Sequence, residues 1–112
     1  MNSPTIPDAL RCILSFGNVT LDCSQYLLKT ILGEVRLNNK EYQLMELFFR
    51  HPRQVFSSEH LMEKVWSLDS EAEMDVVWTY IGFLRRKLRQ IGADIEIRTI
   101  RGAGYALEEM RC

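Results

Sequence analysis

The spacing of apolar residues along the chain begins with a period close to two. Over residues 13–37, short runs such as LSFGNVTLD and EVRLN partly alternate apolar with polar side chains, and alternation is typical of half-buried strands. Gly17–Asn18, Asp22–Cys23–Ser24 and Gly33–Glu34 separate the runs and favour turns. The pattern predicts a small antiparallel sheet over residues 13–37 with turns at these three places.

A helical period follows. In NNKEYQLMELFFRHP the apolar side chains recur at helical spacing, Asn38 and Glu41 can form a capping box at its start, and Pro52 stops it. A second helix is expected from SSEHLMEKVW, with Ser57 as its N-cap. Its inward-facing residues are Leu61, Met62 and Val65.

A third helix is predicted in VVWTYIGFLRRKLRQI. Its buried seam follows spacings of 4, 3, 4 and 3 and consists of Val77, Ile81, Leu84, Leu88 and Ile91. At about 100° per residue, the opposite face holds Asp75, Thr79, Gly82, Arg86 and Arg89, with Trp78 and Arg85 at one shoulder. Gly92 is expected to end the helix in a left-handed conformation.

The tail IEIRTIRGAGYALEE returns to alternation and predicts two strands joined by a tight turn. Gly102 and Gly104 supply the positive φ angles that such a reversal needs. The predicted order is therefore sheet, three helices and terminal hairpin, an α+β arrangement.

The length and composition of the chain indicate a single globular domain. The chain has 112 residues, of which 46% are hydrophobic and 26% charged, as in ordinary globular domains. No apolar run approaches the roughly 18 residues of a membrane span, and MNSPTIPDAL is not a secretory signal. Residues 1–11, with Pro4 and Pro7, are expected to be a linker or disordered N-terminus, and residues 12–110 the domain itself.

The sequence offers few candidate residues for disulfide, metal or catalytic sites. Cys12, Cys23 and Cys112 contain no CxxC pair, and such a scattered odd set is a poor disulfide framework that fits a reducing cytoplasm. The two histidines have no partners at ligand spacing, so no metal or cofactor is expected. Without paired carboxylates, a nucleophile with its base or a phosphate loop, the sequence predicts no enzyme.

Charge is more informative in its distribution than in its total. The formal net charge is −1, yet residues 76–101 hold six basic residues against two acidic ones, whereas residues 1–74 hold seven against ten. A basic zone on an otherwise acidic body indicates an anionic partner.

Four segments carry a family resemblance: LNNKEYQLMELF, HPRQVFSSEHLMEKVW, VVWTYIGFLRRKL and IRTIRGAGYAL. In this order they resemble the DNA-binding effector domain of OmpR/PhoB-type response regulators over residues 34–107. The resemblance implies a winged helix, or winged helix-turn-helix. This fold has an N-terminal four-stranded antiparallel sheet, three helices and a C-terminal β-hairpin wing.

The resemblance also implies a function and partners. The third helix would enter the major groove of promoter DNA, the wing would reach the minor groove or the phosphate backbone, and the loop before the third helix would contact RNA polymerase. Two protomers would occupy tandem half-sites. A receiver domain, phosphorylated by a sensor histidine kinase, normally precedes such a domain. We therefore expect an isolated effector fragment that begins in the interdomain linker.

The candidate contact residues follow from the chemistry of their side chains and from the family resemblance. Arginine suits bidentate contact with guanine edges and phosphates, Thr79 suits a thymine methyl or a phosphate, and Tyr80 matches a phosphate-contacting position of the family. Lys87 points toward the flank, where a surface ion pair is the plainer reading. The predicted DNA contacts are Trp78, Thr79, Tyr80, Gly82, Arg85, Arg86, Arg89, Thr99, Arg101 and Gly102, and the predicted polymerase contacts are Asp69, Glu71 and Glu73.

Plainer alternatives stay open at this point. The arginine cluster can be a solvated helix face, the acidic connector a solvated loop, the wing an unliganded hairpin, and Trp78 a packing residue. Asp75, Gly82 and Phe83 depart from the base-reading residues common in the family. A winged helix that binds protein rather than DNA is the second hypothesis, and weak salt dependence of any DNA binding would distinguish it.

Overall fold

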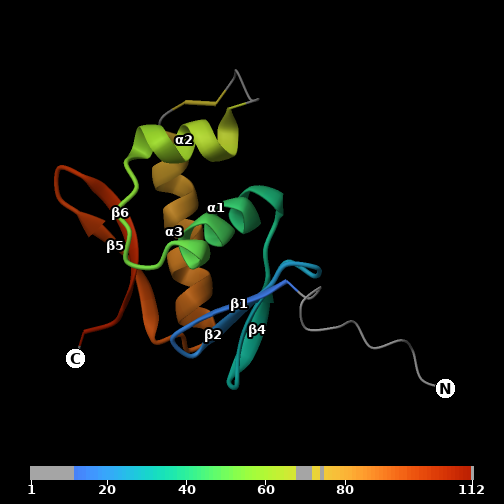
Figure 1. Ribbon diagram of the computed structural model, residues 1–112. Coiled ribbons are helices and arrows are strands. Elements are labelled where there is room, and N and C mark those ends of the chain that lie inside the picture. Colours follow the sequence, from blue (N-terminus) through green and yellow to red (C-terminus); the bar gives the residue numbers. More distant parts are fainter. Residues whose placement is uncertain (1–11, 68–71, 74, 112) are drawn as a thin grey trace.

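The computed structural model describes residues 12–67, 72–73 and 75–111. Four strands come first, followed by three helices and two further strands (Figure 1). Their bounds are β1 (Ile13–Phe16), β2 (Val19–Asp22), β3 (Leu27–Thr30), β4 (Gly33–Arg36), α1 (Asn39–Arg50), α2 (Ser58–Trp66), α3 (Asp75–Gln90), β5 (Ile95–Ile100) and β6 (Gly104–Glu109). The predicted α+β winged-helix order is confirmed. Within the described residues, no helix has the length and apolarity needed to cross a bilayer.

The first four strands form an antiparallel sheet in sequence order. The predicted turns after β1 and β2 are confirmed, but the turn at Gly33–Glu34 is wrong. Thr30 pairs with Gly33, so Ile31 and Leu32 make the reversal and Gly33–Glu34 belong to β4. The Thr30 hydroxyl accepts a hydrogen bond from the Leu32 N–H at 3.0 Å, which holds a turn that neither apolar residue favours by itself.

Both predicted helix starts are confirmed. The Asn38 side chain accepts from the Glu41 N–H at 2.9 Å, and the Glu41 carboxylate accepts from the Asn38 N–H at 2.8 Å, which completes the capping box. At α2, Ser57 Oγ accepts from the His60 N–H at 3.1 Å. Leu61 and Val65 are buried as expected, and Met62 is partly buried against the core.

Helix α3 runs through the middle of the molecule (Figure 1). All five seam residues are buried, as predicted: Val77, Ile81, Leu84, Leu88 and Ile91. The sheet holds the end of the helix, since the Thr30 hydroxyl donates to the Ile91 carbonyl at 2.5 Å and the Asn18 amide donates to the Gly92 carbonyl at 3.0 Å. Gly92 has φ +70°, which confirms the left-handed cap. The rotation of α3 about its axis is therefore fixed.

The β5–β6 hairpin lies beside α3 (Figure 1). Gly102 and Gly104 have φ +77° and +146° at its turn, as predicted. A bridge between Phe56 and Tyr105, with hydrogen bonds of 2.8 and 2.9 Å in the two directions, ties β6 to the segment before α2. The hairpin is consequently attached to the helices on two sides, through α3 and through this bridge.

The expectation that the cysteines form no disulfide is wrong for one pair. Cys12 and Cys23 are joined by a disulfide, with their Cα atoms 5.1 Å apart. The β1–β2 register pairs Ile13 with Asp22, and the Cys23 N–H donates to the Cys12 carbonyl at 2.8 Å. The two cysteines therefore lie opposite each other in the ladder, which their separation in the sequence does not reveal.

Candidate nucleic-acid interface

The outer face of α3 is open to solvent. Asp75, Trp78, Thr79, Arg86 and Arg89 are exposed, whereas Gly82 is half-buried. Trp78 is 69% exposed, so the alternative in which it packs into the core is excluded. The face opposite the buried seam thus presents an aromatic side chain near its start and two arginines further along.

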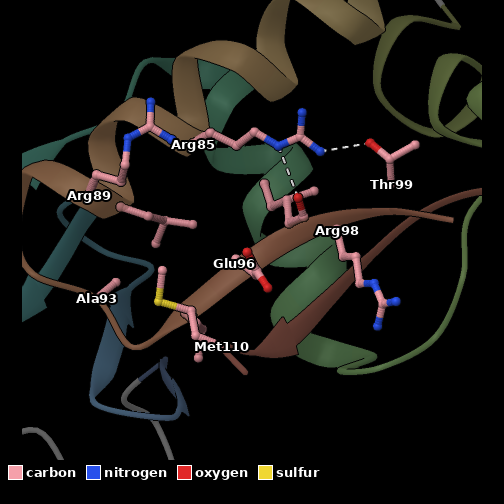
Figure 2. Close-up of a pocket in the computed structure, with 10 residues that line it drawn as sticks. Arg85, Arg89, Ala93, Glu96, Arg98, Thr99 and Met110 are labelled. Atoms are coloured by element: carbon pink, nitrogen blue, oxygen red, sulfur yellow. Dashed lines mark hydrogen bonds between the residues drawn. The ribbon is translucent and has the colours of Figure 1, made fainter. Parts of the chain in front are cut away.

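Arg85 turns away from this face toward the wing. Its Nε donates to the Ile97 carbonyl at 2.9 Å and its Nη2 donates to Thr99 Oγ1 at 2.8 Å (Figure 2). Its guanidinium also lies 6.0 Å from the centre of the Tyr105 ring. Arg85 and Thr99, two predicted DNA contacts, are therefore bonded to each other, and together they join α3 to β5.

Arg86 and Arg89 have different surroundings. The Arg86 guanidinium lies 5.3 Å from the centre of the Phe83 ring, and within the described residues neither arginine forms an ion pair with a carboxylate. Both side chains remain exposed. Their guanidinium groups are therefore available to an external anion.

Lys87 lies on the flank of α3, as predicted, and its charge is neutralised there. Its Nζ donates to the Glu41 carboxylate at 2.6 Å and to the Arg36 carbonyl at 2.9 Å. The predicted ion pair is confirmed, but it is less exposed than expected, because Glu41 is only 3% accessible. Glu41 therefore serves both the capping box of α1 and the contact between α1 and α3.

Thr79 and Tyr80 occupy different positions around the helix. The Thr79 hydroxyl donates to the Asp75 carbonyl at 3.1 Å, so its methyl group and its lone pairs remain for a ligand. The Tyr80 ring packs edge-on against the rings of Trp66 and Phe83, with ring centres 5.2 and 5.4 Å apart. Tyr80 is half-buried between α2 and the outer face.

The wing has one basic residue at its tip. Arg101 and Gly102 are exposed in the turn between β5 and β6. Arg98, further down β5, pairs with Glu108 at 3.2 Å. Glu109 lies at the base of the hairpin. It accepts hydrogen bonds from its own backbone N–H and from the Arg53 guanidinium, and these lower the pKa of its carboxyl group. Arg101 is thus the residue of the hairpin best placed to meet an anion.

A hollow of about 280 Å³ is lined by residues of α3 and of the hairpin (Figure 2). Its basic lining residues are Arg85, Arg89 and Arg98. Its apolar lining includes Leu88, Ile97 and Met110. A second hollow of about 340 Å³ lies between the start of α2 and the wing. The surface between the helices and the hairpin is therefore concave, with basic groups on its α3 side.

The connector before α3 is only partly described. Of the predicted polymerase contacts, Asp69 and Glu71 lie outside the described residues, and Glu73 is exposed. Asp75, the last residue of the predicted connector, is the first residue of α3. The acidic groups that are described therefore face solvent at the start of this helix.

Two features of the site escaped sequence reasoning. The capping-box pattern identified Glu41, but nothing in the sequence connected it with Lys87, which is 46 residues away. The bridge from Phe56 to Tyr105 was also missed, because a single isolated pairing leaves no periodic pattern. Both contacts hold the helix and the wing in position rather than offering groups to a ligand.

Comparison with known proteins identifies the family to which the chain belongs. Residues 33–107 match the family model described as transcriptional regulatory protein, C terminal. The chain is 42% identical over 96 residues to the transcriptional regulatory protein DltR of Streptococcus agalactiae (strain NEM316), covering 86% of this chain and 43% of DltR. The chain therefore spans less than half the length of this relative.

Two solved domains match this chain over most of their own length. The C-terminal domain of NsrR, described as a lantibiotic response regulator and nisin resistance regulator, is 37% identical with a TM-score of 0.74, covering 88% of this chain and 99% of that domain. The DNA-binding domain of Escherichia coli CadC is 25% identical with a TM-score of 0.76, covering 85% and 90% of the two chains.

Proposed function

The chain belongs to the family of C-terminal domains of transcriptional regulatory proteins, and from this premise we propose that it binds double-stranded promoter DNA in a sequence-specific manner. It acts as the output domain of a two-component response regulator and so controls transcription. The observation that carries this proposal is the outer face of α3. Its buried seam fixes the orientation of the helix, and Arg86 and Arg89 extend from the opposite side without carboxylate partners among the described residues.

Helix α3 enters the major groove. A single helix fits this groove, and the exposed side of α3 offers Trp78 and Thr79 on its first turns and Arg86 and Arg89 on its later ones. The arginines contact guanine edges or phosphates, and the Thr79 methyl contacts a thymine methyl. Gly82 has open space where a Cβ would be, so it permits close approach of the helix backbone to the bases. Tyr80 reaches a phosphate at the edge of the groove.

The wing contacts the adjacent minor groove or its phosphates. Arg101 supplies the charge, and Gly102 allows the backbone of the turn to approach. Arg85 and Thr99, because they are bonded to each other, hold the wing at a set distance from α3. Two of the five guanidinium N–H groups of Arg85 are used in this way, and the others remain for the phosphate backbone.

Partners beyond DNA follow from the response-regulator relatives. The connector Ser67–Asp75, with Asp69, Glu71 and Glu73, contacts RNA polymerase through its negative charge. A second protomer binds a neighbouring tandem half-site. In the full-length protein, a receiver domain governed by a sensor histidine kinase controls this domain in the cytoplasm. The similarity to DltR and to the response regulator NsrR supports this setting.

Selection from a pool of randomised duplexes tests the proposal. The wild type is compared with Arg86→Ala/Arg89→Ala, which removes two charges from α3, and with Lys29→Ala/Arg36→Ala, which removes two charges from the four-stranded sheet. We expect the wild type and the sheet variant to enrich one repeated half-site, and the α3 variant to lose the enrichment. Loss of one bidentate contact alone lowers affinity for the selected site by about 5- to 150-fold.

Two outcomes would contradict the proposal. Equal enrichment by both double variants would mean that α3 does not read the DNA. No enrichment by folded wild type at low salt would favour the protein-binding alternative, for which the exposed Trp78 is a suitable anchor. Circular dichroism of each variant establishes that the domain is folded in every comparison.

A further inference from the structure

Cys12 and Cys23 form a chemical group that DNA recognition does not use. The pair lies at the open end of the β1–β2 ladder, opposite the turn at Gly17–Asn18. Both cysteines are only partly buried. A small thiol or disulfide in solution can therefore reach this pair.

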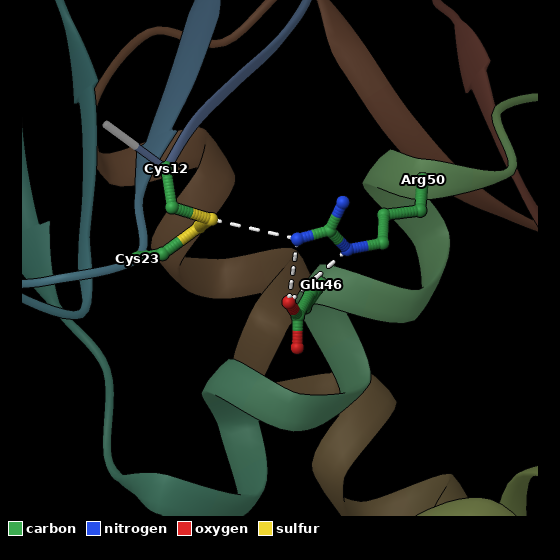
Figure 3. A network of polar contacts seen from close by, with 4 residues as sticks. All are labelled: Cys12, Cys23, Glu46 and Arg50. Atoms are coloured by element: carbon green, nitrogen blue, oxygen red, sulfur yellow. Dashed lines mark hydrogen bonds and ion pairs between the residues drawn. A yellow bond between two sulfur atoms is a disulfide. The ribbon is translucent and has the colours of Figure 1, made fainter. Parts of the chain in front are cut away.

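Two charged side chains of α1 face the sulfur atoms (Figure 3). Arg50 Nη2 lies 3.4 Å from Cys12 Sγ and 3.0 Å from the Glu46 carboxylate. A guanidinium at this distance stabilises the thiolate, which is the form that attacks disulfides. Glu46 has the opposite effect on a thiolate, but its charge is already paired with the same guanidinium. The surroundings therefore favour exchange at Cys12.

The same residues also have the composition of a metal site. One ligand atom from each of Cys12, Cys23 and Glu46 lies within 4.8 Å of the others. However, Arg50 already places a positive charge between the carboxylate and the sulfur (Figure 3). A metal ion would have to displace this guanidinium and accept repulsion from it, so the arrangement favours sulfur chemistry over metal binding.

We propose that Cys12 and Cys23 are a reversible redox site that exchanges with low-molecular-weight disulfides and thiols of the glutathione class. One thiolate attacks the small disulfide, forming a mixed disulfide and releasing one small thiol. The second thiolate then attacks the mixed disulfide and releases the other. The two cysteines lose two electrons and two protons in total, and the small disulfide gains both.

Closing the disulfide changes the anchoring of β1. Among the described strands, β1 lies at the edge of its sheet and pairs with β2 alone. The disulfide fixes the N-terminal end of the strand at Cys12. Reduction leaves this end held by the ladder and by the packing of Leu14 and Phe16 against the core. The redox state therefore sets how firmly the N-terminal end of β1 is held, and this inference does not depend on DNA binding.

The test uses the full chain carrying Cys112→Ser, which leaves only the two cysteines of the pair. The protein is equilibrated in glutathione buffers from fully oxidised to fully reduced, and free thiols are alkylated and counted by mass spectrometry. We expect no free thiol at the oxidised end, two at the reduced end, and the same curve from both directions. Amide exchange in β1 should accelerate about tenfold on reduction, and Tm should fall by at least about 5 °C.

Further variants separate a redox site from a merely structural link. Cys23→Ser should trap glutathione on Cys12, and Arg50→Gln should slow exchange at least about threefold because the Cys12 thiolate loses its guanidinium. Three results would overturn the proposal: two free thiols in every buffer, a disulfide that persists in fully reduced glutathione, or stoichiometric zinc retained by the reduced protein after dialysis.

Discussion

At the scale of single residues, the four basic side chains within residues 85–89 have different roles. Arg85 is bonded to β5 and Lys87 to Glu41, whereas Arg86 and Arg89 face solvent. The buried seam decides this division, because each position around α3 meets a different neighbour. The basic cluster is therefore partly structural and partly available to a ligand.

Lys87 provides the residue-scale prediction. Lys87→Met leaves the Glu41 carboxylate buried without its cation, and we expect a loss of about 2 kcal/mol in the free energy of unfolding. This is below the 3–5 kcal/mol of fully buried pairs, because the Lys87 side chain is itself 26% exposed. Urea denaturation measures the change.

The control is Lys64→Met, which removes an exposed lysine from α2 and should change stability by less than about 0.5 kcal/mol. Adding Glu41→Gln to Lys87→Met should restore part of the loss, since the amide oxygen can still accept from the Asn38 N–H. Equal losses for the two lysine variants would show that the ion pair contributes nothing specific.

At the scale of elements, the wing depends on how its turn meets the segment before α2. Gly104 has φ +146°, and a Cβ there would lie 2.0 Å from the Phe56 carbonyl oxygen. That oxygen accepts the hydrogen bond from the Tyr105 N–H. The close approach of the two backbones thus requires glycine at this position, in addition to the turn itself.

Three alanine substitutions test this requirement in steps. Gly33→Ala meets no neighbour and has no positive φ, so stability should change by at most about 0.5 kcal/mol. Gly102→Ala has a positive φ in open space and should cost about 1 kcal/mol. Gly104→Ala has both a positive φ and a backbone clash and should cost at least about 2 kcal/mol.

Thermal unfolding of the three variants gives the order of their stabilities. DNA affinity should fall for Gly104→Ala more than for Gly102→Ala, because only the former displaces the whole wing. A Gly104→Ala protein as stable as Gly33→Ala would contradict the requirement for a close backbone approach.

At the scale of the whole molecule, a slightly acidic protein carries exposed arginines on α3 and at the wing tip. The formal net charge is −1, and the acidic groups Glu41 and Glu108 neutralise Lys87 and Arg98 internally. Among the basic residues of 76–101, the exposed ones are Arg86, Arg89 and Arg101. Within this segment, the accessible positive charge therefore lies on α3 and at the wing tip.

Salt dependence of DNA binding provides the whole-molecule prediction. With about three phosphates neutralised per protomer, log K should fall against log salt with a slope of about −3 per protomer. Fluorescence anisotropy between about 50 and 300 mM KCl measures this slope. Arg101→Ala should reduce its magnitude by about one, and a slope near zero would contradict a DNA interface built on these arginines.

The sequence by itself determined the elements, because their signals are local. The capping box at Asn38, the serine cap of α2, the seam of α3 and the glycines of the wing each lie within a few residues of what they specify. The family resemblance came from the same local segments. Strand alternation also located the first sheet, since half-buried strands show a period of two wherever one face meets a core.

Only the tertiary structure decided what depends on distant partners. The turn at Ile31–Leu32 is held by the Thr30 hydroxyl, the Arg85 guanidinium is bonded to β5, and the Glu41 carboxylate meets Lys87 across the core. Cys12 meets Cys23 because the β1–β2 register places them opposite each other. Each of these contacts is set by register or packing, and neither leaves a periodic trace along the chain.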